Sequence, residues 1–315
     1  MDSGRFGKFN KLLDEHNATS SWVFFQKLLV DYDFIFDELL SERCYQTESD
    51  EYSRYFDIAE SLEYSREFLY CLSNSLGERF DVLSRSFING KPIYTFKPVA
   101  DSYDKENGFT NGFINIAYEN TARDGLTIVH ETFHLFNYGL MDVDGKKIIN
   151  LTSRLFTELV SILAEKLYIA YAFNKKYIDT NEVALLFNDR IDNTYLSIYI
   201  TKCEQLYLEL NKKGIYIDPY IIKQIKKEFK GVPYYDDFWK RECKTKDVVT
   251  NAVTRGTLTY PINLGYLLGE FYSNLILEHD KNPKELLVEL NEIITDPYVR
   301  YDDVMEKCLE KRLKH

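Results

Sequence analysis

The sequence predicts a mainly α-helical protein with one small β-sheet. Apolar residues recur at helical spacing along most of the chain, whereas alternation with a period of two is confined to residues 112–118, and a second strand-like run covers 92–98. The chain has 315 residues, of which 45% are hydrophobic. A chain of this size can bury a sizeable core without disulfide bonds, so we expect an ordinary globular protein.

The individual elements follow from this spacing and from turn residues at the breaks. The N-terminal part shows helical spacing over 20–42 and 50–86, and a turn signal at 89–92 precedes the two short strands. Residues 101–108, between the strands, have the composition of a loop. From residue 122 onward the pattern is almost entirely helical, with expected helices over 122–139, 150–174, 181–213, 218–230, 260–279, 283–294 and 299–313.

Charge and cysteine content exclude several classes of protein. The net charge is −11, with no basic stripe, so we expect no nucleic-acid partner. Five cysteines are scattered without a C-x-x-C pair, which indicates reduced thiols. No signal sequence and no long apolar window is present, so we expect a cytoplasmic protein that makes no use of a membrane; a protein exported without a signal would share these features. The oligomeric state stays open.

One motif in the chain points to metal chemistry. Of only five histidines, His130 and His134 lie in a His-Glu-x-x-His pattern with Glu131 between them. Residues four apart lie on one face of a helix, so both imidazoles can reach one metal ion, and Glu131 can deprotonate a water held there. The alternative is a pair of hydrogen-bonded core or surface histidines. The apolar neighbours in 128–136 favour the metal, because a buried helix needs a reason to carry two histidines.

A third metal ligand is expected on the next helix. Glu158, Ser161 and Glu165 are spaced i, i+3, i+7 and therefore share one face, flanked by aliphatic residues. Glu158 is the natural third ligand, and Glu165 or Ser161 could orient a ligating histidine. The alternative is that both glutamates pair with lysines on the surface. Asp124, near the start of the motif helix, is expected to be an N-terminal helix residue and not a catalytic one.

Three segments resemble the thimet oligopeptidase and oligoendopeptidase F family of zinc peptidases. Residues 103–136 are similar to the strand, turn and H-E-x-x-H helix of that family, and 158–165 to its E-x-x-S-x-x-x-E segment; 265–273 resembles its tyrosine-rich helix. The resemblance covers roughly residues 90–310. It implies a zincin-like core of the gluzincin type, with the small sheet beside the active-site helix. It also implies Glu158 as the third zinc ligand and Tyr266, or secondly Tyr260, as the donor to the oxyanion. Phe133 stands where the family usually has glycine.

These observations lead to a functional prediction. We expect residues 89–315 to form one compact metallopeptidase catalytic region, on which an N-terminal helical segment, 1–88, packs. One Zn²⁺ per chain would be held by His130, His134 and Glu158, and Glu131 would serve as general base and then acid in hydrolysis of oligopeptides. Strand 113–118 would offer an edge to an extended peptide; the alternative is that it only holds the small sheet together. Two alternatives remain: a catalytically degenerate, peptidase-like binding or scaffold protein, and a protease effector of narrow specificity.

Overall fold

The computed structural model describes residues 45–49, 51–99, 108–110, 112–138, 142–143, 146–147, 151–212 and 260–296, and the single positions Leu39, Lys227, Val299 and Val304. The chain divides into two compact units. One combines Met1–Arg43 with Asp192–Leu267, and the other combines Cys44–Ile191 with Leu268–His315. We call the second the motif unit, because it contains the His-Glu-x-x-His sequence. This grouping does not test our division of the chain at residue 88, which stays a prediction.

The prediction of a mainly helical protein is confirmed. The described helices are α4 (Ile58–Leu72), α5 (Asn74–Ser84), α6 (Ala122–Tyr138), α7 (Leu151–Asn174), α8 (Thr180–Lys212), α12 (Tyr260–His279) and α13 (Pro283–Ile294). Five of them begin and end within about one residue of the expected bounds. The expected helices over 20–42, 218–230 and 299–313 lie almost entirely outside the described residues.

The region 50–86, where the sequence shows helical spacing, contains two helices, the first of which begins at Ile58. The break falls at Ser73, which has extended backbone angles. Its backbone N–H donates to Leu69 O and closes α4, while its side chain accepts from the backbone N–H of Leu76 and caps the start of α5. A serine can therefore end one helix and begin the next without an intervening loop. The apolar periodicity continues across the break, so spacing alone did not reveal it.

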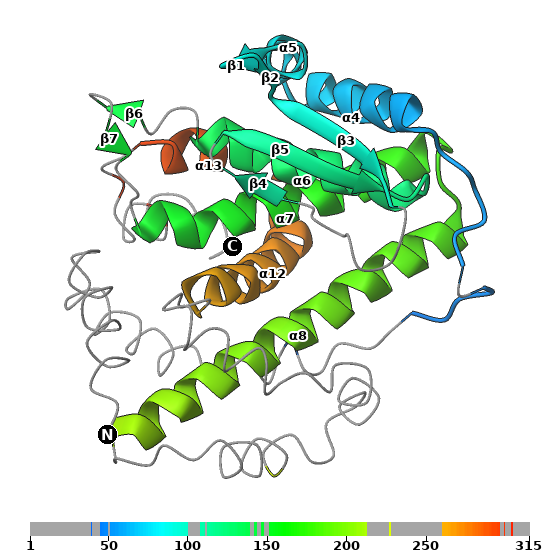
Figure 1. The fold of residues 1–315 in the computed structure, drawn as a ribbon. Helices are drawn as coiled ribbons and strands as arrows, with labels where there is room; N and C mark the ends of the chain where they lie inside the picture. Colours follow the sequence, from blue (N-terminus) through cyan, green and yellow to red (C-terminus); the bar gives the residue numbers. More distant parts are fainter. Residues whose placement is uncertain are drawn as a thin grey trace. The chain divides into compact units, whose positions relative to one another are not determined.

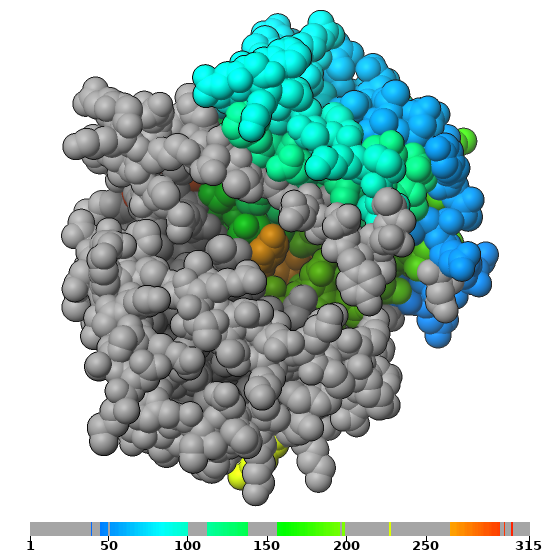
Figure 2. All heavy atoms as spheres, in the orientation of Figure 1, coloured from blue at the N-terminus to red at the C-terminus, as the bar shows by residue number. Residues whose placement is uncertain are grey.

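The strands form one three-stranded sheet and two short hairpins. Strands β3 (Tyr94–Pro98), β5 (Phe113–Tyr118) and β4 (Gly108–Thr110) lie in that order, with β5 parallel to β3 and antiparallel to β4. The hairpins pair β1 (Phe87–Ile88) with β2 (Lys91–Pro92), and β6 (Asp142–Val143) with β7 (Lys146–Lys147). Figure 2 shows atoms of α4, α5 and β1 to β3 (blue to cyan) on the visible surface, and Val82 and Phe87 of these elements are more than half exposed.

Our expectation that β5 offers a free edge is wrong, because β5 is the middle strand and is paired on both sides. The edges of this sheet are β3 and β4. We assigned Gly108 to a loop, whereas it begins β4. This strand is only three residues long and turns back into β5 at Gly112, whose φ of 87° suits glycine. A run of three residues is too short to show the alternation that identifies a strand.

The motif helix α6 lies at the centre of the motif unit. It packs against α7, α4 and α13, and β4 and β5 contact it from the sheet (Figure 1). Its apolar side chains, Ile128, Val129, Phe133 and Phe136, are completely buried. At its start, the Asp124 carboxylate accepts hydrogen bonds from the backbone N–H groups of Glu119 and Thr121. Asp124 is thus a buried residue that fixes the entry into α6, as expected for a residue at a helix N-terminus.

The packing of Tyr168 of α7 against α6 depends on a glycine. A Cβ atom at Gly125 would lie 2.2 Å from the Tyr168 hydroxyl of α7, a distance that no real Cβ contact shows. The hydroxyl of Ser65 on α4 donates to the backbone carbonyl of the same glycine. Three helices therefore meet at this turn, about one and a half turns before His130, the first residue of the motif. Within the parts of the chain described above, no helix combines the length and the apolar character needed to cross a membrane.

Candidate metal centre

Two imidazoles and one carboxylate converge between α6 and α7. His130 and His134 lie one turn apart on α6, and their Nε2 atoms are 2.9 Å apart. Glu158 reaches them from α7: its Oε2 lies 3.6 Å from His130 Nε2, and its Oε1 lies 3.5 Å from His134 Nε2. The three residues are almost completely enclosed, with His130 and Glu158 only 6% and 8% exposed. These are the three residues that the sequence spacing predicted as metal ligands.

The separations fit a small divalent ion. Ligand atoms about 2.0–2.1 Å from a tetrahedral ion lie roughly 3.3 Å from one another. The two nitrogen–oxygen distances, each to a different oxygen of Glu158, are slightly longer than that value, and the nitrogen–nitrogen distance is somewhat shorter. One ligand atom from each residue lies within 4.8 Å of the other two. His130, His134 and Glu158 therefore form a buried group that could hold a metal ion.

His134 is held in the form that a metal requires. Burial, and secondly the neighbouring His130, hold the pKa of His134 well below its ordinary value. The imidazole is consequently neutral at physiological pH and keeps a lone pair for coordination. A protonated imidazole in the same position would have to shed its proton before it could bind an ion.

The second nitrogen of each imidazole faces α7. His130 Nδ1 lies 2.7 Å from Glu165 Oε1, and His134 Nδ1 lies 3.4 Å from Ser161 Oγ. The Ser161 hydroxyl also lies 3.3 Å from the backbone carbonyl of His130. In both rings Nε2 therefore points toward Glu158 while Nδ1 points toward a polar group on the same helix. A polar group beside one ring nitrogen favours the tautomer that leaves the other nitrogen free for a metal.

The alternative of surface ion pairs for the two glutamates is excluded by their burial. Glu158 and Glu165 are 8% and 7% exposed, and Ser161 between them is completely buried. Their i, i+3, i+7 spacing places all three on the face of α7 that meets α6. Glu165 is paired with His130 and with an arginine, and not with a surface lysine.

The structure does not test the predicted roles of the other site residues. Glu131 is 8% exposed and follows His130 directly on α6; its role as base and acid stays a prediction. Tyr266 belongs to the other compact unit, and so does Tyr260, at which α12 begins. Their assignment as oxyanion donors stays a prediction that rests on the family resemblance.

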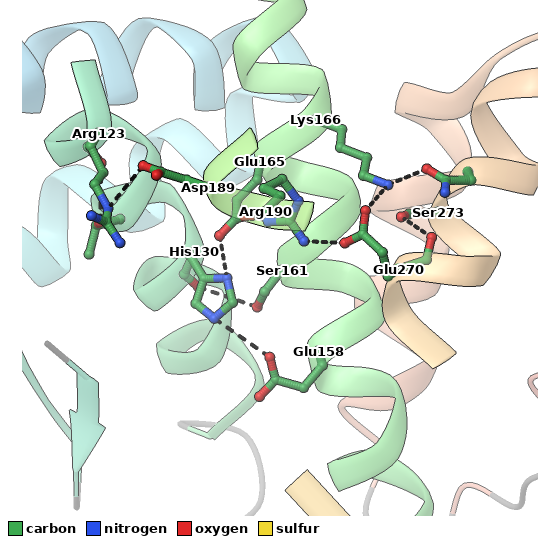
Figure 3. A network of polar contacts seen from close by, with 12 residues as sticks. Arg123, His130, Glu158, Ser161, Glu165, Lys166, Asp189, Arg190, Glu270 and Ser273 are labelled. Carbon is green, nitrogen blue, oxygen red and sulfur yellow. Dashed lines mark hydrogen bonds and ion pairs between the residues drawn. The ribbon is translucent and has the colours of Figure 1, made fainter. Parts of the chain in front are cut away.

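Sequence reasoning missed a set of charged residues behind Glu165 (Figure 3). Arg190, on α8, pairs with Glu165 and also with Glu270 on α12, and Glu270 pairs with Lys166 on α7. We call Glu165, Arg190, Glu270 and Lys166 the charge network. The signal that could have found it is Glu165 and Lys166 themselves, two adjacent charges in the middle of an otherwise apolar helix.

Comparison with protein-family models, with curated proteins and with solved structures finds no match to this chain.

Proposed function

We propose that this protein is a zinc-dependent metallopeptidase that hydrolyses peptide bonds in oligopeptides. The observation that carries the proposal is the convergence of His130, His134 and Glu158 on one point, with Glu131 lying between the two histidines in the sequence. Two histidines and one carboxylate are the ligand set of a catalytic zinc that keeps a coordination position open. The resemblance of three sequence segments to the oligopeptidase family points in the same direction and suggests a zincin-like core.

The chemistry assigns a role to each residue. His130, His134 and Glu158 would hold the ion, which supplies Lewis acidity to polarise a peptide carbonyl and to make a water more acidic. Glu131 would accept a proton as this water adds to the carbonyl carbon, and would deliver it to the departing amine as the carbon–nitrogen bond breaks. Tyr266 or Tyr260 would donate a hydrogen bond to the oxygen that becomes negatively charged. The scattered cysteines suit a reducing compartment such as the cytoplasm.

The proposal is tested by measuring metal content and peptide cleavage on the same preparations. We expect one zinc per chain and cleavage of a mixed library of fluorescence-quenched oligopeptides. In Glu131→Gln the zinc should remain, because Glu131 is no ligand, while cleavage should fall by at least about 10²-fold. The matched control is Glu78→Gln, an exposed glutamate on α5, which should retain both.

Each alternative predicts a different result. Zinc in the wild type without cleavage of any peptide would favour the binding or scaffold protein. Absence of zinc would remove the basis of the proposal. Cleavage that is confined to one folded protein, with no turnover of short peptides, would favour an effector of narrow specificity. Cleavage that survives Glu131→Gln would show that another group supplies the base.

A further inference from the structure

We infer that Arg190 and Glu270 are positioning residues that hold the Glu165 carboxylate against His130 and thereby fix its tautomer. The charge network, and not Glu165 alone, would set which nitrogen of His130 faces the metal position. For its effect on metal affinity the inference rests on the proposed function. Its effect on His130 can be observed without any metal.

The two oxygens of Glu165 have separate partners. Oε1 lies 2.7 Å from His130 Nδ1, and Oε2 is paired with Nη1 of Arg190. Arg190 in turn uses Nη2 to pair with Oε2 of Glu270. The guanidinium thus bridges two carboxylates that come from different helices, α7 and α12. Because its donors form a rigid planar fork, it fixes the orientation of both carboxylates.

Glu270 is itself held from a second direction. Its Oε1 lies 2.5 Å from Lys166 Nζ, and the same ammonium contacts the side-chain oxygen of Asn274 on α12. Negative and positive groups therefore alternate from His130 through Glu165, Arg190 and Glu270 to Lys166. Four helices, α6, α7, α8 and α12, contribute to this series, so rotation of one side chain would disturb the next.

Because the charge network is buried, each of its charges needs its partner. The four charged side chains are only 2–11% exposed, and their two positive and two negative charges balance. A buried carboxylate without its arginine is an uncompensated charge, which costs several kcal/mol and favours another rotamer or an inserted water. An ion pair elsewhere in the core could stabilise the protein equally well. Here, instead, one oxygen of the Glu165 carboxylate is held against the imidazole of His130, a residue of the candidate metal centre.

The tautomer of His130 is what this arrangement determines. A neutral imidazole carries its proton on Nδ1 or on Nε2. A carboxylate 2.7 Å from Nδ1 favours a proton on that nitrogen, which leaves the Nε2 lone pair facing Glu158 and His134. Disturbing a group that orients a metal-binding histidine typically lowers metal affinity by about 10- to 100-fold. Arg190 and Glu270 act one step further from the metal but on the same carboxylate.

The test compares Arg190→Gln and Arg190→Lys with the wild-type chain. In metal-free protein labelled with ¹⁵N-histidine, long-range ¹H–¹⁵N spectra report the tautomer of each ring, and His130→Gln identifies the His130 signals. We expect the Nδ1-protonated form in the wild type, a mixture of both tautomers in Arg190→Gln, and partial restoration in Arg190→Lys. Zinc affinity, measured by competition with a chelator, should fall by roughly 10-fold or more in Arg190→Gln.

A second arginine–carboxylate pair supplies the control. Arg66 on α4 pairs with Asp81 on α5 through Nε and Nη2, at 2.6 and 3.0 Å. Arg66→Gln breaks a pair of the same kind in the same unit without touching the charge network. It should leave the His130 tautomer and the zinc affinity unchanged. Circular dichroism of each variant shows that the comparison is made on folded protein.

The outcomes separate this inference from the proposed function. An Nε2-protonated His130 in the wild type overturns the inference, whatever the variants do. So does a folded Arg190→Gln variant with the wild-type tautomer and zinc affinity. If the tautomer shifts as expected but the wild type binds no zinc or cleaves no peptide, the positioning role stands and the metallopeptidase proposal falls.

Discussion

His130 and Glu165 lie on different helices, yet His130 Nδ1 is only 2.7 Å from Glu165 Oε1. The contact joins α6 to α7 directly behind the candidate metal centre of His130, His134 and Glu158, since the other nitrogen of the same ring faces Glu158 at 3.6 Å. The geometry of the site therefore depends on the packing of α7 and its neighbours as well as on the motif helix.

The approach of α12 to α7 depends on Gly269. A Cβ atom there would lie 2.8 Å from Ile162 Cδ1 and 3.0 Å from the backbone nitrogen of Leu159, next to Glu158, the proposed third ligand. The α7 backbone cannot move aside as a side-chain tip can, so Gly269→Ala should destabilise the protein by about 1–3 kcal/mol. Because the strain falls beside Glu158, zinc affinity should fall as well. Denaturant unfolding and chelator competition measure the two effects.

Gly77 offers the control for this prediction. A Cβ at Gly77 would press on the ring of Tyr70, at 2.3 Å, between α5 and α4. Gly77→Ala should therefore lower stability while leaving zinc affinity unchanged. Equal zinc affinities in Gly269→Ala and the wild type would mean that α12 does not determine the position of Glu158.

Phe133 stands inside the motif but belongs to the hydrophobic core. It is completely buried, and its ring meets that of Phe136 edge to face at 5.6 Å. Phe133→Ala should cost about 3–5 kcal/mol in the free energy of unfolding, because it leaves a large cavity. Zinc should remain bound to the folded variant, since Phe133 provides no ligand. Phe173, which is 46% exposed on α7, is the control, and Phe173→Ala should change stability by less than about 0.5 kcal/mol.

Asp124 fixes the entry into the motif helix. Its two carboxylate oxygens each accept a backbone N–H at 3.0 Å, from Glu119 and from Thr121. Asp124→Ala leaves these donors without their acceptor and should destabilise the protein by about 1–2 kcal/mol. Hydrogen exchange should be fastest to respond in residues 119–126. Asp124→Asn keeps one acceptor oxygen, so its stability should lie between those of the alanine variant and the wild type. An alanine variant whose amides are as protected from exchange as those of the wild type would contradict this role.

Glu270 gives the stability a dependence on acid pH. Burial raises the pKa of Glu270, but Arg190 and Lys166 outweigh burial and lower the pKa to about 2, from 4.5. Between these values the unfolded chain binds more protons than the native one, so this contribution is complete above pH 4.5 and is lost as the pH falls toward 2. Urea midpoints at several pH values should show this loss in the wild type.

Glu270→Gln cannot titrate and should lack this part of the pH dependence. It should also be less stable at neutral pH, because Arg190 and Lys166 lose their shared carboxylate. Identical slopes of stability against pH in the variant and the wild type would mean that the carboxylate is not held in its charged form.

The long helices were predictable from the sequence, and the short elements were not. In α6 and α7 the apolar spacing continues over 17 and 24 residues, which is enough to define the bounds closely. The hairpins β1–β2 and β6–β7 have two residues a strand, and pairing across a turn decides whether such residues form a strand. The central position of β5 depends on β4, which has too few residues to show a pattern.

Part of the candidate site was likewise predictable from the sequence, and part of it was not. His130, His134 and Glu158 lie on helices whose internal spacing is fixed, so their types and positions in the sequence indicated that they share a site. Arg190 and Glu270 come from two further helices, and only the packing of α8 and α12 on α7 brings them to Glu165. Their own neighbourhoods in the sequence contain no metal-binding pattern. The adjacent charges Glu165 and Lys166 indicate that buried partners are needed, but nothing in the sequence identifies Arg190 and Glu270 as those partners.

The central claim is that His130, His134 and Glu158 bind one metal ion together. X-ray absorption at the zinc edge, combined with metal content, tests it most directly. We predict one zinc per chain, with two imidazole nitrogens and one carboxylate oxygen at about 2.0–2.2 Å. His130→Gln and Glu158→Gln should each lose this environment, and Glu131→Gln should retain it. Zinc that is absent from the wild type, or an unchanged coordination shell in Glu158→Gln, would contradict the account.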